Sequence, residues 1–126
     1  MEFLGKWKLK KMLSADENGV KLLEGEELLK LAAEDGDIEK LLRSDFYITE
    51  EAIEIYFRPN EEEIPMAIEE GLEITELGVL IESHSAKIED GALMIDYDGS
   101  GDYLPVSIDE EECISISDGM MIIERA

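Results

Sequence analysis

The stretch DYDGSGDY, residues 96–103, is the part of the chain whose residue types look most like a metal site. A calcium loop takes oxygen ligands from its first, third, fifth and twelfth positions and has glycine at its sixth. Asp96, Asp98 and Ser100 fit the first half, but the twelfth residue is Ser107, where a glutamate is needed. The flanking residues alternate as in strands, so we predict the tip of a hairpin here. Weak divalent-cation binding is kept as a third hypothesis for the function.

Catalytic residue types are few in the rest of the chain. The single histidine is His84, and in a strand its neighbours Ser83 and Ser85 would point to the opposite face, which argues against a Ser–His pair. With one cysteine, Cys113, a zinc site lacks ligands, and there is no phosphate-binding glycine loop or dinucleotide fingerprint. We therefore expect no catalytic residue, no metal ligand and no cofactor. Pairs of carboxylates among the 33 acidic residues are compatible with an enzyme, but we favour a non-enzymatic role.

The charge of the chain limits its partners, because the formal net charge is -22 at pH 7. Phosphate backbones and anionic membrane surfaces would be repelled, so we expect neither nucleic acid nor a membrane as a partner. Cations or a basic protein would be attracted by the same field. The first residues have no apolar signal segment, which leads us to expect a cytoplasmic protein.

Two hydrophobic periods alternate along the chain, which we expect to form a single domain over residues 1–126. Residues 3–13 alternate like a half-buried strand, and residues 14–24 read as a polar connection. Residues 25–43 then have the period of two short helices, with Asp37 as the cap of the second. Neither helix is long enough to be stable alone, so both must pack on another element.

After these helices the period returns to two. We expect further strands at residues 46–49, 52–58, 79–88, 92–97, 102–108, 112–117 and 120–125, a short helix at 65–70, and Asp-Gly turns at 90–91 and 118–119. A sheet of about eight short antiparallel strands tends to close, because closure removes its edges. The prediction is a mainly β fold: a single antiparallel up-and-down β-barrel, with the helix-turn-helix of residues 25–43 inserted between the first two strands.

Residues near both ends of the chain resemble a known superfamily. Gly5-Lys6-Trp7 is similar to the Gly-x-Trp of the first strand of lipocalins and fatty-acid-binding proteins, the calycins, and Arg125 is similar to their last-strand arginine. The chain looks like a small bacterial lipocalin-like protein. The resemblance implies a barrel, a helical lid made by residues 25–43, and a structural pair of Trp7 and Arg125 in a cation–π contact worth about 0.5–2 kcal/mol.

The resemblance also implies that the barrel binds a small apolar molecule beneath this lid. The Arg-x-Tyr pair by which fatty-acid-binding proteins hold a carboxylate has no match here, so a fatty acid is not implied as the ligand. Arg58 or His84 could meet a polar end of the ligand. The apolar residues that we expect to line the site are Phe46, Ile48, Ile55, Phe57, Ile81, Leu93, Ile95 and Leu104.

A second hypothesis is a structural or protein-interaction module. Residues 120–123, MMII, are apolar on both faces of the expected strand, which indicates cover by a helix or by a partner subunit. The acidic surface would then serve assembly with another protein, and a homodimer remains open.

Overall fold

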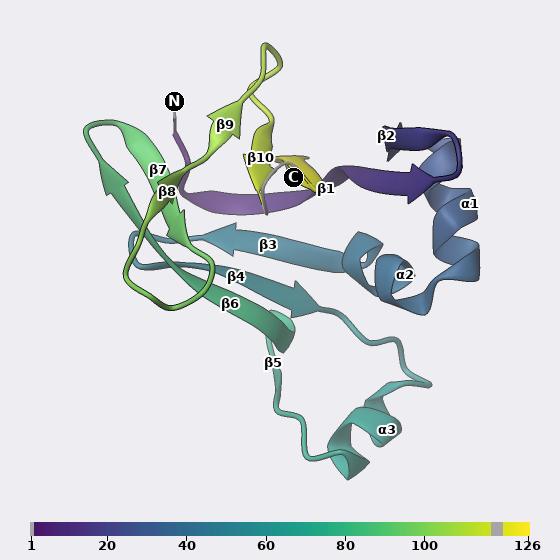
Figure 1. Ribbon diagram of the computed structural model, residues 1–126. Coiled ribbons are helices and arrows are strands. Elements are labelled where there is room, and N and C mark those ends of the chain that lie inside the picture. Colours follow the sequence, from purple (N-terminus) through teal and green to yellow (C-terminus); the bar gives the residue numbers. More distant parts are fainter. Residues whose placement is uncertain (1, 117–119) are drawn as a thin grey trace.

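The computed structural model describes residues 2–116 and 120–126 (Figure 1). Strands hold 49% of the described residues, which confirms the prediction of a mainly β protein. The predicted turn at 118–119 lies outside the described residues. The elements are β1 (Gly5–Asp16), β2 (Gly19–Glu24), α1 (Glu26–Glu34), α2 (Gly36–Leu42), β3 (Ser44–Ile48), β4 (Ala52–Phe57), α3 (Ile64–Glu69), β5 (Ile74–Thr75), β6 (Gly78–Glu89), β7 (Ala92–Asp96), β8 (Leu104–Pro105), β9 (Ser107–Ile108), β10 (Ile114–Ile116) and β11 (Met121–Arg125).

The strands form one antiparallel sheet that nearly closes into a barrel. Its order is β8-β7-β6-β4-β3-β1-β11-β10-β9, with β2 paired to β1 and β5 paired to β6. The two end strands, β8 and β9, are separated only by Val106, whose amide donates to the carbonyl of Leu93 over 3.0 Å. One short segment therefore contacts β7 on one side and β10 on the other. The path has nine strands rather than about eight, because this segment is divided in two.

The connection predicted for residues 14–24 is wrong: these residues continue β1 and form β2. The hairpin pairs Leu13 with Leu22 and Ala15 with Val20. Only Leu23 of β2 is buried, and Val20 is 63% exposed, so β2 lacks the buried alternating face by which a strand is recognised. The helices consequently follow a hairpin and lie in sequence between the barrel neighbours β1 and β3.

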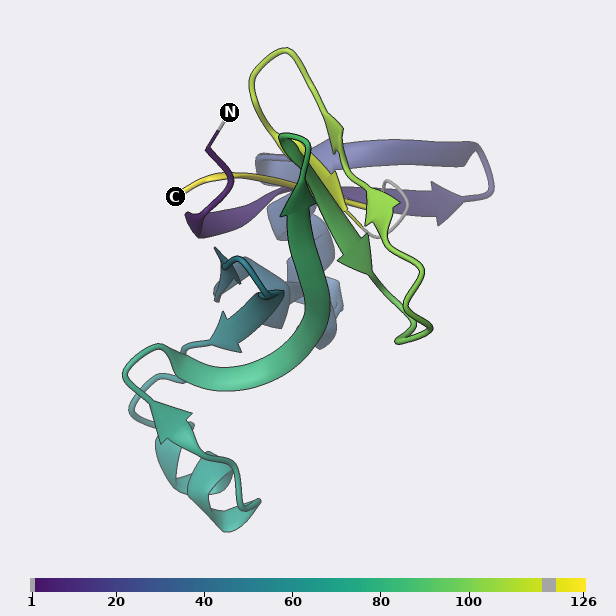
Figure 2. The same cartoon turned by 90° about the vertical axis from the view of Figure 1, so that its left-hand side faces the viewer.

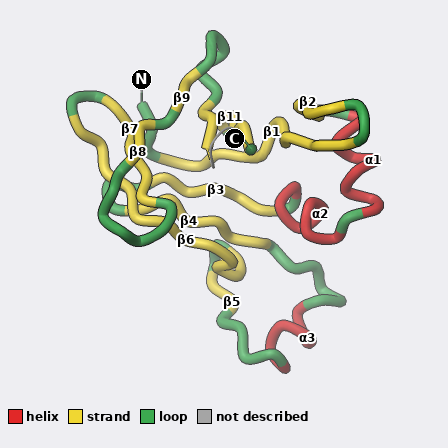
Figure 3. Tube along the Cα trace, in the orientation of Figure 1, coloured by secondary structure: helices red, strands yellow, loops and turns green. Residues whose placement is uncertain are grey.

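The two predicted helices of residues 25–43 are present as α1 and α2, at one end of the barrel, with α1 beside β2 and α2 next to β3 (Figure 3). Their expected apolar faces pack on the core, with Leu28, Ala32 and Ile38 buried. The cap of α2 is Asp35 rather than Asp37: the Asp35 carboxylate accepts the amide of Asp37 over 3.0 Å. A cap two residues earlier satisfies a free amide at the start of the helix.

The barrel interior is filled by the side chains of its own strands. One continuous apolar core contains the inward-facing residues of nearly every long strand together with one face of α1 and one face of α2. Its largest fully buried side chains are Trp7, Phe46, Ile48, Ile53, Ile55, Leu93, Ile95, Ile114 and Ile123. Packing of this kind gives the sheet a rigid wall on which surface elements can be placed.

Residues 59–77 leave the barrel between β4 and β6, and we call them the arm. The arm contains α3 and β5 and extends away from the barrel (Figure 2). The short helix predicted at 65–70 is confirmed, with a proline in its first turn. Arg43 joins the arm to the end of α2, because its guanidinium lies 2.6 Å from the Glu63 carboxylate.

Candidate ligand-binding pocket

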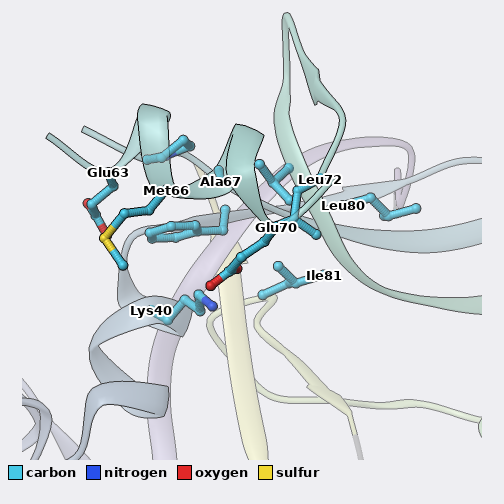
Figure 4. A pocket seen from close by; sticks show the side chains of 11 residues that line it. Lys40, Glu63, Met66, Ala67, Glu70, Leu72, Leu80 and Ile81 are labelled. Atoms are coloured by element: carbon cyan, nitrogen blue, oxygen red, sulfur yellow. The ribbon is translucent and has the colours of Figure 1, made fainter. Parts of the chain in front are cut away.

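A pocket of about 540 Å³ lies where the arm meets the barrel (Figure 4). Its walls come from α2, from the end of β4, from α3 and from the start of β6. The residues that line it are Lys40, Phe57, Pro59, Glu63, Met66, Ala67, Glu70, Leu72, Val79, Leu80 and Ile81. Eight of these eleven residues are apolar, so the pocket offers mainly an apolar surface.

Two backbone features shape the β6 side of the pocket. The β4–β6 register passes from Ile55 opposite Glu82 to Tyr56 opposite Leu80, which leaves Ile81 as an extra residue. Such a bulge turns consecutive side chains toward one side, and Leu80 and Ile81 both line the pocket. At Gly78, φ is +117° and a Cβ atom would lie 2.5 Å from the carbonyl oxygen of Phe57, so only glycine allows this close approach.

Charged groups surround the ring of Phe57 at one wall. The Arg43 guanidinium lies 4.9 Å and the Lys40 ammonium 5.3 Å from the ring centroid, both in cation–π contact. The hydrogen bond from Arg43 lowers the pKa of the Glu63 carboxyl below its usual value, which keeps this carboxylate ionised. In Figure 4 the charged ends of Lys40 and Glu70 point toward the same part of the pocket.

Two residues that the sequence singles out lie together in this pocket, Phe57 and Ile81. Arg58 follows Phe57 directly, but its guanidinium is turned to the buried carboxylate of Asp45, with Nε 3.0 Å from the nearer oxygen. Lys6 lies 3.7 Å from the same carboxylate. Arg58 is therefore an ion-pair partner of the barrel wall and does not line the pocket.

Five other predicted ligand-binding residues belong to the core. They are at most 2% exposed and pack against one another inside the barrel: Phe46, Ile48, Ile55, Leu93 and Ile95. The last two lie elsewhere on the surface. The His84 ring nitrogen Nε2 is 2.9 Å from the Glu82 carboxylate, with the ring edge against Tyr97, and Leu104 is 50% exposed on β8.

Trp7 and Arg125 are register partners on β1 and β11. The Arg125 guanidinium carbon lies 4.2 Å from the centroid of the Trp7 ring, and its nitrogens donate to the carbonyls of Leu4 and Glu2. Gly5 has φ +126°, and a Cβ there would be only 3.1 Å from Nη1 of Arg125. The Gly-x-Trp spacing thus leaves room for the arginine to cross the indole.

The hairpin tip predicted at residues 96–103 is confirmed, since it joins the paired strands β7 and β8. The buried Asp96 carboxylate accepts the amides of Gly99 and Gly101, each over 2.9 Å, and both glycines have positive φ. In the part of the chain that the structure describes, no group of three or more His, Cys, Asp or Glu side chains could hold a metal ion.

Cys113 is buried, and its burial raises the pKa of the thiol, which disfavours the reactive thiolate.

The pocket residues that the sequence pattern misses come mainly from the arm and from β6: Lys40, Pro59, Glu63, Met66, Ala67, Glu70, Leu72, Val79 and Leu80. The signal available for them is the Pro65 of a short helix followed by Gly71, which marks an excursion from the sheet. A second pocket, of about 580 Å³, lies by the β3–β4 turn and is lined by Leu4, Ile48, Thr49, Glu50 and Glu51. It draws on fewer elements and fewer apolar side chains than the first.

Comparison of the chain with models of protein families, with curated proteins and with solved structures gave no match. Among residues 2–116 and 120–126, none of the helices has the length and apolar character needed to cross a membrane. The case for a function therefore rests on the geometry of the pocket and on the residues around it.

Proposed function

We propose that the protein is a non-enzymatic, lipocalin-like binding protein that holds a small apolar molecule in the pocket between α2, α3 and β6. The observation that carries the proposal is an apolar lining, eight residues of eleven, around about 540 Å³. Pockets for small molecules typically have about 300–1,000 Å³ and a mostly apolar lining with a few charged groups. The lipocalin-like assignment is supported by the contact of Trp7 with Arg125 across Gly5.

The proposed site lies outside the barrel interior. The resemblance to lipocalins would instead place a ligand inside the barrel. A molecule inside would have to displace core side chains such as Phe46 and Leu93, both 0% exposed. Insertion of further groups into a filled core costs about 1–3 kcal/mol or more for each small addition. The pocket requires no such displacement, and α2 and α3 stand on its two sides as a lid would.

The proposal is tested by titration with Nile red, a neutral apolar dye whose fluorescence rises on leaving water. Leu80→Glu places a carboxylate in the lining, where Leu80 is already 45% exposed, so the fold should tolerate it. We expect this variant to bind the dye at least about tenfold more weakly, because a charge beside an apolar ligand loses its hydration. The matched control is Leu104→Glu, a 50% exposed strand leucine outside the pocket.

The control variant should bind the dye as the unchanged protein does. Absence of dye binding by the unchanged protein would contradict the proposal. An equal loss in Leu80→Glu and Leu104→Glu would also contradict it, since the dye would then bind to apolar surface in general. Ala67→Phe, which fills the same pocket from α3, should lower the affinity without adding a charge.

A further inference from the structure

The arm carries an unusual share of the exposed apolar surface. Among the residues that the structure describes, fourteen large apolar side chains are exposed, and five of them lie on the arm: Met66, Ile68, Leu72, Ile74 and Leu77. Ile68 is the most exposed of these, at 64%. A concentration of exposed apolar side chains in one segment is typical of an interaction site, because contact of apolar side chains with water is unfavourable.

The arm is also strongly acidic. Residues 59–77 contain no lysine or arginine and seven glutamates: Glu61, Glu62, Glu63, Glu69, Glu70, Glu73 and Glu76. Of these, Glu63 is paired with Arg43, and the other six are exposed. Exposed apolar side chains are thus interspersed with carboxylates, so a partner must present apolar groups and positive charge together.

We propose that the arm is a docking site for a basic amphipathic segment of another protein, one with an apolar face flanked by lysine and arginine. Charge complementarity decides between the occupants. A second copy of this chain would bring two sets of seven glutamates together, at a net charge of -22 for each chain. A basic segment instead finds attraction at the rim and apolar contact at the centre, the usual arrangement of a protein interface.

This inference goes beyond the binding of a small molecule and can be tested separately from it. Ile68 and Leu77 are exposed on the arm and do not line the pocket. Substitutions at these two residues can therefore abolish the binding of a partner while the pocket stays intact.

The probe is a fluorescent amphipathic peptide of about 18 residues, made of leucine and lysine so that one helical face is apolar. Its binding is followed by fluorescence anisotropy, against a peptide of the same composition with its leucines spread around the helix. We expect the amphipathic peptide to bind more tightly and to weaken as salt is added. Ile68→Glu should reduce its affinity at least about tenfold, as expected for an apolar anchor.

The matched control for Ile68→Glu is Leu29→Glu, because Leu29 is a 62% exposed helical residue outside the arm. A second pair of variants tests the charge. Glutamine at Glu69, Glu73 and Glu76 should lower the affinity and its salt dependence, whereas glutamine at Glu26, Glu34 and Glu110, which are also exposed, should have a much smaller effect.

Three outcomes would overturn the inference. The scrambled peptide could bind equally well, Leu29→Glu could lose as much affinity as Ile68→Glu, or the chain could sediment as a dimer that Ile68→Glu makes monomeric. In the last case the arm binds a second copy. Nile red binding should be unchanged in Ile68→Glu, so failure of the dye experiment and failure of the peptide experiment remain distinguishable.

Discussion

At the scale of single residues, Arg125 ties the last strand to the first. Its guanidinium covers the Trp7 ring at 4.2 Å and donates to two carbonyls of the N-terminal segment. The Trp7 indole nitrogen in turn donates to the carbonyl of Phe3 over 2.9 Å. These contacts hold the N-terminal segment against the seam between β1 and β11, a role independent of any ligand.

Arg125→Ala should lower the free energy of unfolding by about 1–3 kcal/mol, the sum of a cation–π contact and two hydrogen bonds. Urea unfolding followed by the fluorescence of Trp7, the single tryptophan, measures this directly. Lys8→Ala is the control, since Lys8 is an exposed β1 residue with a surface ion pair to Glu124 at 3.5 Å. Equal stability of the two variants would refute a special role for Arg125.

Asp96 organises the turn that looks most like a metal site in the sequence. Its side chain is buried and satisfies the amides of Gly99 and Gly101. We expect Asp96→Ala to cost about 1–3 kcal/mol of stability in thermal unfolding, because two amides lose their acceptor. Asp102→Ala, an exposed position in the same turn, should cost much less, and the reverse order would count against this account.

At the scale of elements, the ion pair of Arg43 and Glu63 ties the arm to the end of α2. Because the pKa of Glu63 is lowered in the folded protein, folding favours its ionised form. The stability it contributes is present above the unfolded pKa of a glutamate, about 4.3, and is lost as the pH falls through the lower folded value.

Glu63→Gln should therefore lower the melting temperature at pH 7, and the difference from the unchanged protein should shrink below about pH 4. Differential scanning calorimetry between pH 7 and pH 3 measures it, with the exposed neighbour Glu62→Gln as the control. A difference that does not shrink between pH 7 and pH 3 would contradict a stabilising role of the ion pair.

Elements with a regular apolar period are predictable from the sequence, and irregular ones are not. Ile53, Ile55 and Phe57 alternate in the sequence and are all buried on β4. The β2 strand is not recognisable, because Val20 and Leu22 are exposed and no buried face sets its period. Its pairing with β1 comes from backbone hydrogen bonds across the hairpin, which any side chain compatible with a strand permits.

The pocket is even less visible in the sequence. It combines residues from α2, the end of β4, the arm and β6, which only the fold brings together. The bulge at Ile81 changes which β6 side chains face the pocket, and no local period reveals it. Of the lining, only Phe57 and Ile81 are among the residues singled out from the sequence. Phe57 belongs to the regular alternation of β4, whereas Ile81 is the extra residue of the bulge.

At the scale of the whole molecule, the side chains of the core occupy the barrel interior, and the two proposed binding sites lie on elements outside it. The core side chains of opposite strands occupy the interior, so α2 and the arm, together with the ends of β4 and β6, form the concave surface. The net charge of -22 adds a preference for basic partners, which the arm concentrates with its seven glutamates.

The most direct test of the central claim is a methyl-resolved NMR titration of the intact protein with Nile red. The account predicts that signals of the pocket residues Met66, Leu72, Val79, Leu80 and Ile81 shift with the dye concentration. Signals of the core residues Ile55, Leu93 and Ile95 should remain in place. Shifts of the core methyl groups with unchanged pocket signals would contradict the account and would place the ligand inside the barrel.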